Sequence, residues 1–352
     1  WGQLAIALAL AIGARVFILV TSHGMMDGDE AVLGIQAERI LRGAHPIYFY
    51  GQPYMGSWDA YLAAPLVALF GPSAWPLHLV TLTESLPLVP LLGALATRLY
   101  GVRGRMPAML LAAIPPEYVA VGELRMLGGY VETLVLGTAL LLLATTIVGR
   151  WREGRSTLAQ WLLVGLLTGL ALWIDVLISY YLIAGAIWMA PHAIGRARRG
   201  WRERGRTVRG AAAAGVVCVA AMALTATPAI VYAVQNRFAN VTVVTGHPAW
   251  LDHVSPIRGS VLLYLVTHDL PSVFGIRMLW HTPMLIALAL GVVAGIAAAA
   301  ALGYGASRLL VADVKNRRLD TLAAGIWAHW NDVLPLLLLG VIVVLYWRSA
   351  NT

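Results

Sequence analysis

Two long stretches of this sequence, Leu134–Val148 and Leu336–Tyr346, contain no charged side chain. A helix needs about 20 apolar residues to cross the hydrocarbon core of a bilayer, where every backbone polar group must be satisfied internally. The whole chain is 59% hydrophobic and 12% charged, whereas about a quarter of the residues in an ordinary soluble domain are charged. These features predict an all-α, polytopic transmembrane helix bundle.

The same length criterion predicts about nine transmembrane spans, which form a single domain over residues 1–352. One stretch, Leu158–Ala190, is too long for one helix and is expected to cross twice, turning near Asp175. The chain starts at Trp1 without a methionine, so we expect missing N-terminal residues, and we also expect a shortened or missing C-terminal part. The predicted spans are Leu4–Val20, Trp75–Leu99, Met106–Val121, Tyr130–Val148, Leu158–Ile174, Val176–Met189, Ala211–Val234, Pro283–Leu302 and Val333–Trp347.

Most basic residues gather in one set of connecting loops, and the positive-inside rule places such loops in the cytoplasm. The net charge of +8 therefore reflects membrane topology, and no nucleic-acid partner is expected. The opposite, external face receives residues 22–74 and 235–282, two loops long enough to carry function. Abundant Ala, Gly and Arg with few Lys suggest a GC-rich bacterial genome, so we expect a bacterial inner (plasma) membrane. The basic loops contain Arg98, Arg103 and Arg105; Arg150, Arg152 and Arg155; Arg196 to Arg209; and Arg308, Lys315, Arg317 and Arg318.

The first external loop holds a group of acidic residues. Asp29 and Glu30 open a stretch with helically spaced apolar residues, which predicts an interfacial amphipathic helix, and a second such helix is expected at Asp59–Phe70. With Asp27, they would lie beside a lipid headgroup, where a carboxylate can deprotonate a hydroxyl and neighbouring carboxylates can hold a divalent cation. The alternative is that Asp29 is only an N-cap and Glu30 only complements the helix dipole.

Arg15 interrupts the first predicted span. An arginine within the membrane normally faces the protein interior and has a partner. Arg15 lies toward the external end of its span, so Asp27 or Asp29 is an expected partner, and Arg15 would then border the substrate site. The alternative is that its side chain snorkels to the interface.

The order of several segments resembles that of the C-type membrane glycosyltransferases, in the bacterial branch related to protein O-mannosyltransferases and lipid A aminoarabinose transferases. An arginine in the first helix precedes an Asp-Glu-Ala sequence that opens a helix in the first external loop. The resemblance covers roughly Ala14–Leu182 and weakens in the later helices. The further segments that carry it are YFYGQPYMGSWDAYLAAPL, GGYVETLVLG and LALWIDVLISYYL.

This resemblance implies a polyprenyl-phosphate sugar donor, an external active site and inversion at the anomeric carbon. Asp29 matches the loop carboxylate that acts as general base or orients the acceptor, and Glu30 would assist it. Arg125 and Tyr130 fall where the donor phosphate is expected, and a guanidinium suits phosphate oxygens. A divalent metal ion at Asp29 and Glu30 would be the cofactor. The acceptor would be a glycan, a lipid or a protein.

Other polar residues are candidates for substrate binding, each with a structural alternative. Gln52, Tyr54 and Asp59 could recognise sugar hydroxyls or belong to a polar turn. Glu84 and Glu132 could line a cavity within the membrane. Asp175, with two tyrosines after it, could border the site, although tyrosines also anchor proteins at membrane interfaces. Glu123 could pair with Arg125 and have no other role. These residues are Gln52, Tyr54, Asp59, Glu84, Glu123, Glu132 and Asp175.

Two other functions remain open at this stage. The expected short C-terminal part would suit a non-catalytic subunit that keeps the fold in order to scaffold a membrane complex. Buried charges such as Arg15 and Glu84 would suit a transporter or lipid flippase. Loss of sugar transfer on substitution of Asp29 would separate the enzyme from the scaffold, and substrate movement without covalent transfer would indicate the transporter.

Overall fold

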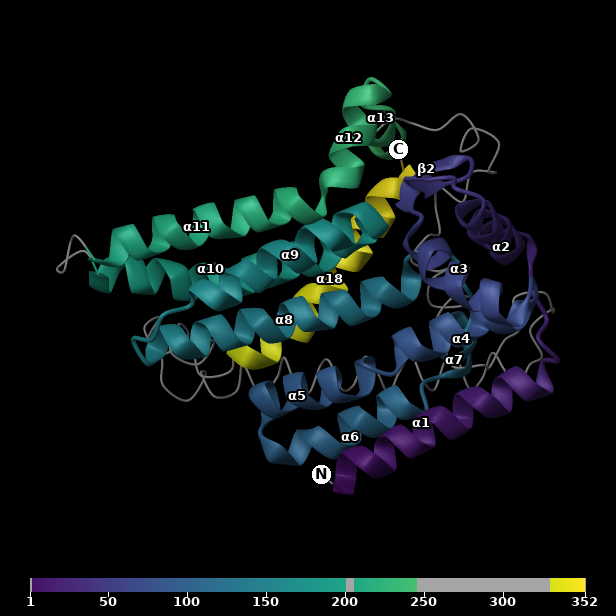
Figure 1. Cartoon of the computed structure of the whole chain (residues 1–352). Coiled ribbons are helices and arrows are strands. Elements are labelled where there is room, and N and C mark those ends of the chain that lie inside the picture. The colour runs from purple at the N-terminus through teal and green to yellow at the C-terminus, as the bar shows by residue number, and fades with distance from the viewer. Residues whose placement is uncertain (1, 201–205, 246–329, 352) are drawn as a thin grey trace. The chain divides into compact units, whose positions relative to one another are not determined.

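The computed structural model describes residues 2–200, 206–245 and 330–351 (Figure 1). These residues are mostly helical, as the sequence predicts, with one two-stranded sheet. The chain divides into two compact units, residues 1–115 with 121–249, and residues 116–120 with 250–352. All candidate site residues lie in the first unit.

The elements of the described residues follow one another along the chain with short connections. They are α1 (Gly2–Thr21), α2 (Gly28–Leu41), β1 (Tyr48–Phe49), β2 (Gln52–Gly56), α3 (Trp58–Phe70), α4 (Ala74–Ser85), α5 (Leu88–Tyr100), α6 (Val102–Ala113), α7 (Glu117–Gly122), α8 (Tyr130–Arg152), α9 (Leu158–Ile174), η1 (Val176–Ile178), α10 (Ser179–Gly200), α11 (Arg206–Thr225), α12 (Thr227–Gln235), α13 (Ala239–Thr245) and α18 (Trp330–Asn351).

Four helical segments of the described part are long and apolar enough to cross a membrane. A fifth span results if α11 and α12, which meet at a 64° bend, are counted as one. The membrane character is therefore supported, and the described residues contain four or five of the nine spans predicted for the whole chain. The four segments are Gly2–Thr21, Ala74–Tyr100, Tyr130–Arg152 and Val176–Ala197.

The remaining predicted spans have different outcomes. Met106–Val121 is not one helix, because Pro115 and Pro116 separate α6 from α7 and proline lacks the backbone N–H that a helix interior needs. Leu158–Ile174 is a helix of 17 residues. The predicted span Val333–Trp347 lies within the helix α18, in which Val333–Ile342 is apolar. The predicted span Pro283–Leu302 lies outside the described residues, as does most of the loop 235–282.

The predicted turn near Asp175 is confirmed. Helix α9 ends at Ile174, and Asp175 has an extended backbone, with φ −154° and ψ 133°. Its side chain accepts a hydrogen bond from the Leu177 backbone N–H, so Asp175 caps the short helix η1 that leads into α10. Both α9 and α10 pack against α8, as Figure 1 shows.

Helices α9 and α11 of the first unit pack closely against each other. A Cβ atom added to Gly165 would lie 2.2 Å from the Cys218 carbonyl oxygen, and one added to Gly169 would lie 2.1 Å from that of Met222. The two helices can approach this closely because neither glycine has a side chain. Small residues serve the same purpose at helix interfaces within membranes.

Both helices predicted in the first long loop are present, as α2 and α3. The β1–β2 hairpin between them was not predicted. Helices α2, α3 and α4 enclose an apolar cluster that includes Leu33, Ala63, Leu77 and Met126, all of them buried. Met126 comes from the segment before α8, so this cluster brings that segment to the start of the first loop.

Candidate functional site

The three carboxylates at the start of α2 have different environments. The N-cap of the helix is Asp27, and therefore not Asp29 as one alternative reading of the sequence had it. The Asp27 side chain accepts a hydrogen bond of 3.0 Å from the Glu30 N–H, and the Asp27 N–H donates one of 3.0 Å to Glu30 Oε2. This reciprocal capping box satisfies two N–H groups that a helix end leaves free.

Glu30 connects the start of α2 to two other segments. Its side chain is fully buried, and its Oε1 accepts a hydrogen bond of 3.2 Å from the Met126 N–H. The same oxygen lies 3.3 Å from His78 Nε2 on α4, and Oε2 lies 3.5 Å from Arg125 Nε. Protein donors thus occupy both oxygens, which weighs against Glu30 as a proton acceptor for substrate or as half of the expected metal site with Asp29.

His78 is a contact that the sequence did not indicate. It lies within a predicted span, and nothing in its sequence neighbourhood connects it to an acidic residue 48 positions away. A buried polar side chain inside an apolar helix was the one available signal, because such a group normally finds a partner.

Arg125 is held at the same place by two carboxylates. Its guanidinium forms an ion pair with Asp27 and approaches Glu30, while 36% of its side chain remains exposed. The structure thus brings together Asp27, Glu30 and Arg125, three of the candidate site residues, and it leaves part of the guanidinium accessible to an anion. Tyr130, expected beside Arg125, begins α8 with about half of its side chain exposed.

Asp29 differs from its two acidic neighbours because it is exposed and, among the described residues, has neither a hydrogen bond nor an ion pair. Tyr54, Asp29 and Asp175 lie close enough to interact. Burial raises the pKa of the Tyr54 hydroxyl, and the negative charges of Asp175 and then Asp29 raise it further. Tyr54 donates a hydrogen bond of 2.8 Å to Gln52 Oε1. Four predicted site residues therefore share one region of the first unit.

Asp175 is the buried carboxylate of this region. It is 3% exposed, and burial raises its pKa to about 6, although the hydrogen bond from the Leu177 N–H opposes the shift. The segment that carries Arg125 reaches Asp175 through Gly129, where an added Cβ would lie 2.9 Å from the Asp175 Cβ. Gly129 also has φ +97°, so both its conformation and its surroundings require glycine.

Arg15 does not pair with Asp27 or Asp29, and it does not snorkel, so both expectations were wrong. Its side chain is 1% exposed and forms an ion pair with Glu123. It also donates to Ser85 Oγ at 2.8 Å and to the carbonyl oxygens of Ala11, Ala112 and Ala113 at 3.1–3.2 Å. The expected Glu123–Arg125 pair is therefore replaced by a buried Glu123–Arg15 pair, and the hydrogen bonds of Arg15 join α1 to α4 and α6.

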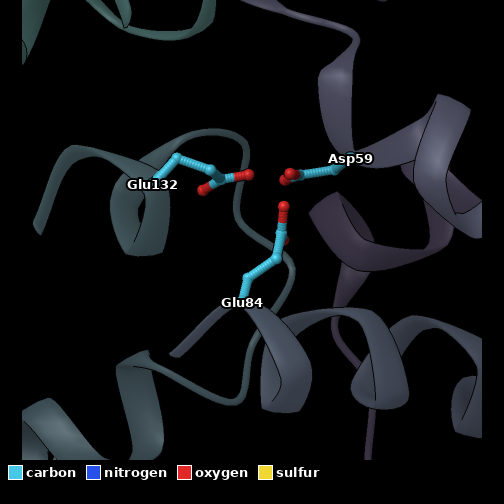
Figure 2. A group of neighbouring side chains, drawn as sticks. All are labelled: Asp59, Glu84 and Glu132. Carbon is cyan, nitrogen blue, oxygen red and sulfur yellow. The ribbon is translucent and has the colours of Figure 1, made fainter. Parts of the chain in front are cut away.

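A second acidic group lies deeper in the first unit. Asp59 of α3, Glu84 of α4 and Glu132 of α8 each offer a carboxylate oxygen, and these oxygens all lie within 4.8 Å of one another (Figure 2). Asp59 is 2% exposed and Glu132 is 6% exposed, and burial raises the pKa of Asp59. Asp59 is therefore not at the surface with Gln52 and Tyr54, as was expected of a sugar-binding residue. The sequence suggested a shared cavity for Glu84 and Glu132 but did not connect Asp59 to them, because the three acids lie on three different helices.

Comparisons of the chain with protein-family models, with curated proteins and with solved structures gave no match.

Proposed function

We propose that this protein is a membrane glycosyltransferase that moves a sugar from a polyprenyl-phosphate donor to an acceptor hydroxyl. The observation that carries the proposal is the difference between Asp29 and the two other carboxylates at the start of α2. Asp27 and Glu30 are engaged by the capping box, Arg125, His78 and Met126, whereas Asp29 on the same turn is exposed and unpaired within the described residues. A carboxylate presented in this way is available to a substrate.

The reaction needs three things from the protein: alignment of the acceptor, removal of its proton and stabilisation of the departing phosphate. The acceptor oxygen attacks the anomeric carbon on the side opposite the phosphate, which inverts the configuration there. As the bond from carbon to the phosphate oxygen breaks, its electron pair leaves with polyprenyl phosphate. Asp29 receives the proton of the acceptor hydroxyl, and the exposed part of Arg125 contacts the phosphate.

Other residues in this proposal position Asp29 and Arg125 or contact the substrate. The hydrogen bond from Met126 N–H to Glu30 and the contact of Glu30 with His78 fix the Arg125 segment against α2 and α4. Tyr54 interacts electrostatically with Asp29 and Asp175 and donates a hydrogen bond to Gln52, and these residues would contact sugar hydroxyls. The site would open to the external face of a bacterial inner membrane, and the acceptor would be a glycan, a lipid or a protein.

Transfer of labelled sugar in membranes that contain the full chain tests this proposal. The donors are polyprenyl-phosphate hexoses and pentoses, and the Asp29→Asn variant is compared with wild type. Loss of a general base costs typically 10²–10⁴-fold in rate, so we expect a loss of at least ~100-fold with an unchanged melting temperature.

Glu38→Gln is the matched control, because Glu38 lies on the same helix and pairs with the exposed Arg42. We expect this variant to transfer sugar at the wild-type rate. Equal transfer by wild type and Asp29→Asn would refute the role of Asp29, and the absence of transfer from every donor would refute the enzyme.

A further inference from the structure

The acidic triad of Asp59, Glu84 and Glu132 has an unused oxygen on each of its members. Asp59 Oδ1, Glu84 Oε2 and Glu132 Oε1 are buried and have no hydrogen-bond partner. Asp59 and Glu132 are both more than nine-tenths buried, and Figure 2 shows all three carboxylates directed toward one another. A buried carboxylate oxygen without a partner costs free energy, so three of them on neighbouring carboxylates require a physical reason.

No basic side chain compensates the triad within the described residues. The buried guanidinium of Arg15 pairs with Glu123, and Arg125 pairs with Asp27 and Glu30. The ion pairs of Arg42 and Arg155 are made with exposed carboxylates elsewhere. The negative charge of the triad therefore has to be balanced by protons or by a bound cation.

Neutral N–H donors contact two of the three carboxylates. Trp58 Nε1 donates a hydrogen bond of 2.9 Å to Glu84 Oε1, and the backbone N–H groups of Gly128 and Gly129 approach the Asp59 carboxylate. These contacts orient the carboxylates of Glu84 and Asp59. Metal ligands are commonly oriented by a surrounding set of hydrogen bonds of this kind.

A shared proton is the competing way to balance the charge. Asp59 and Glu132 form a hydrogen bond with each other, which requires a proton on one of the two. That proton serves Asp59 and Glu132, but Glu84 Oε2 is buried and has no hydrogen-bond partner among the described residues. A cation bound by all three carboxylates would balance the charge of the whole triad, Glu84 included.

We propose that Asp59, Glu84 and Glu132 bind one divalent cation of the oxygen-preferring class, such as Mg²⁺, Mn²⁺ or Ca²⁺. Metal–oxygen bonds of 2.0–2.6 Å place two ligand oxygens of one ion roughly 3 to 5 Å apart, and the triad oxygens lie within 4.8 Å of one another. The absence of sulfur or nitrogen ligands in the triad favours this class over Zn²⁺ or Cu²⁺. The site would tie α3, α4 and α8 together.

Binding of Mn²⁺ alone tests this inference, independently of any sugar transfer. The full chain is purified in detergent, stripped with a chelator and titrated with Mn²⁺, while the signal of free Mn²⁺ is followed by electron paramagnetic resonance. We expect saturable binding of one Mn²⁺ per chain, competition by Mg²⁺ or Ca²⁺, and a rise in melting temperature of about 5 °C when the ion is at ~100 times its Kd.

The variants identify the ligands. Glu84→Gln keeps the size of the side chain and the Trp58 contact, and we expect it to weaken Mn²⁺ binding at least ~10-fold. Glu38→Gln, an acid-to-amide change at a residue that pairs with the exposed Arg42, is expected to bind Mn²⁺ as wild type does. Affinity should fall as the pH is lowered, because the ion displaces the proton shared by Asp59 and Glu132.

Two results would overturn the inference. One is wild-type protein that shows no saturable Mn²⁺ binding and no cation-dependent change in melting temperature, which would leave shared protons as the balance of charge. The other is equal Mn²⁺ binding by folded Glu84→Gln and wild type, which would place the ion elsewhere. Neither result depends on whether the protein transfers sugar.

Discussion

Replacement of Arg15 by methionine removes the most connected buried side chain of the first unit. The guanidinium donates to Glu123, to Ser85 and to three backbone carbonyls. Two of these carbonyls belong to Ala112 and Ala113, the last residues of α6, where a helix leaves its C=O groups unsatisfied. Methionine fills similar space but donates no hydrogen bond, so the change tests the charge and the hydrogen bonds together.

The expected loss of stability comes mainly from the Glu123 carboxylate, which would stay buried without its partner because its side chain is 1% exposed. Removal of one partner from a buried ion pair costs about 3–5 kcal/mol, because an uncompensated charge stays buried. We therefore expect Arg15→Met to lower the free energy of unfolding by about 4 kcal/mol. A second change, Glu123→Gln, removes the stranded charge and should restore about 2 kcal/mol of that loss.

The loss of unfolding free energy in Arg15→Met should also depend on pH. Burial raises the pKa of Glu123 and Arg15 opposes this shift, so Arg15→Met raises the pKa further. A carboxyl group whose pKa is higher in the folded state stabilises the fold below its unfolded pKa, and this contribution is lost as the pH rises through the folded value. The variant should therefore be closer to wild type at pH 5 than at pH 8.

Unfolding by SDS in mixed micelles, followed by tryptophan fluorescence, measures these differences. The matched control is Arg42→Met, because the Arg42–Glu38 pair is exposed and such pairs contribute about 0–1 kcal/mol. Two results would refute the reasoning: an Arg15→Met variant as stable as the Arg42→Met variant, or one whose loss is the same at pH 5 and pH 8.

Two further predictions concern Asp175 and Gly165. Burial raises the pKa of Asp175 to about 6, so its contribution to stability is present below its unfolded pKa of ~3.9 and is lost as the pH rises through about 6. Asp175→Asn should therefore flatten the wild-type profile of melting temperature against pH over this window. An unchanged profile would contradict the assignment of this pKa to Asp175. Gly165→Ala would place a Cβ 2.2 Å from the Cys218 carbonyl oxygen and should lower the free energy of unfolding by about 1–3 kcal/mol. Gly13→Ala, with nothing within 4 Å of its Cβ, is the control and should have a small effect. Equal melting temperatures of the two variants would argue against the close approach of α9 and α11.

The helical class and several helix positions could be predicted because apolar length and helical periodicity are local signals. The turn at Asp175 follows from a stretch too long for one span, and α2 follows from the spacing of its apolar residues after an acidic start. The break between α6 and α7 was missed although Pro115 and Pro116 mark it. The prediction of one span there relied on the length of the apolar stretch and gave too little weight to the two prolines, which lack backbone N–H donors.

The partners of the charged residues could not be predicted, because each pair joins distant parts of the chain. Sequence proximity suggested Glu123 with Arg125 and Asp27 or Asp29 with Arg15, yet the structure pairs Glu123 with Arg15 and Asp27 with Arg125. The individual residues were identified as candidates because buried charges in apolar surroundings need partners. Which partner each one takes depends on helix packing that periodicity does not specify.

The measurement that tests the central claim most directly is the stoichiometry of the transfer reaction. Membranes with the full chain, or with its Asp29→Asn variant, receive a polyprenyl-phosphate sugar labelled in both parts, and released polyprenyl phosphate and sugar on the acceptor are quantified together. The proposal predicts one polyprenyl phosphate released for each sugar transferred by wild type, and at least ~100-fold less of both by the variant. Labelled sugar that crosses the membrane still attached to its lipid, with neither product formed, would contradict it.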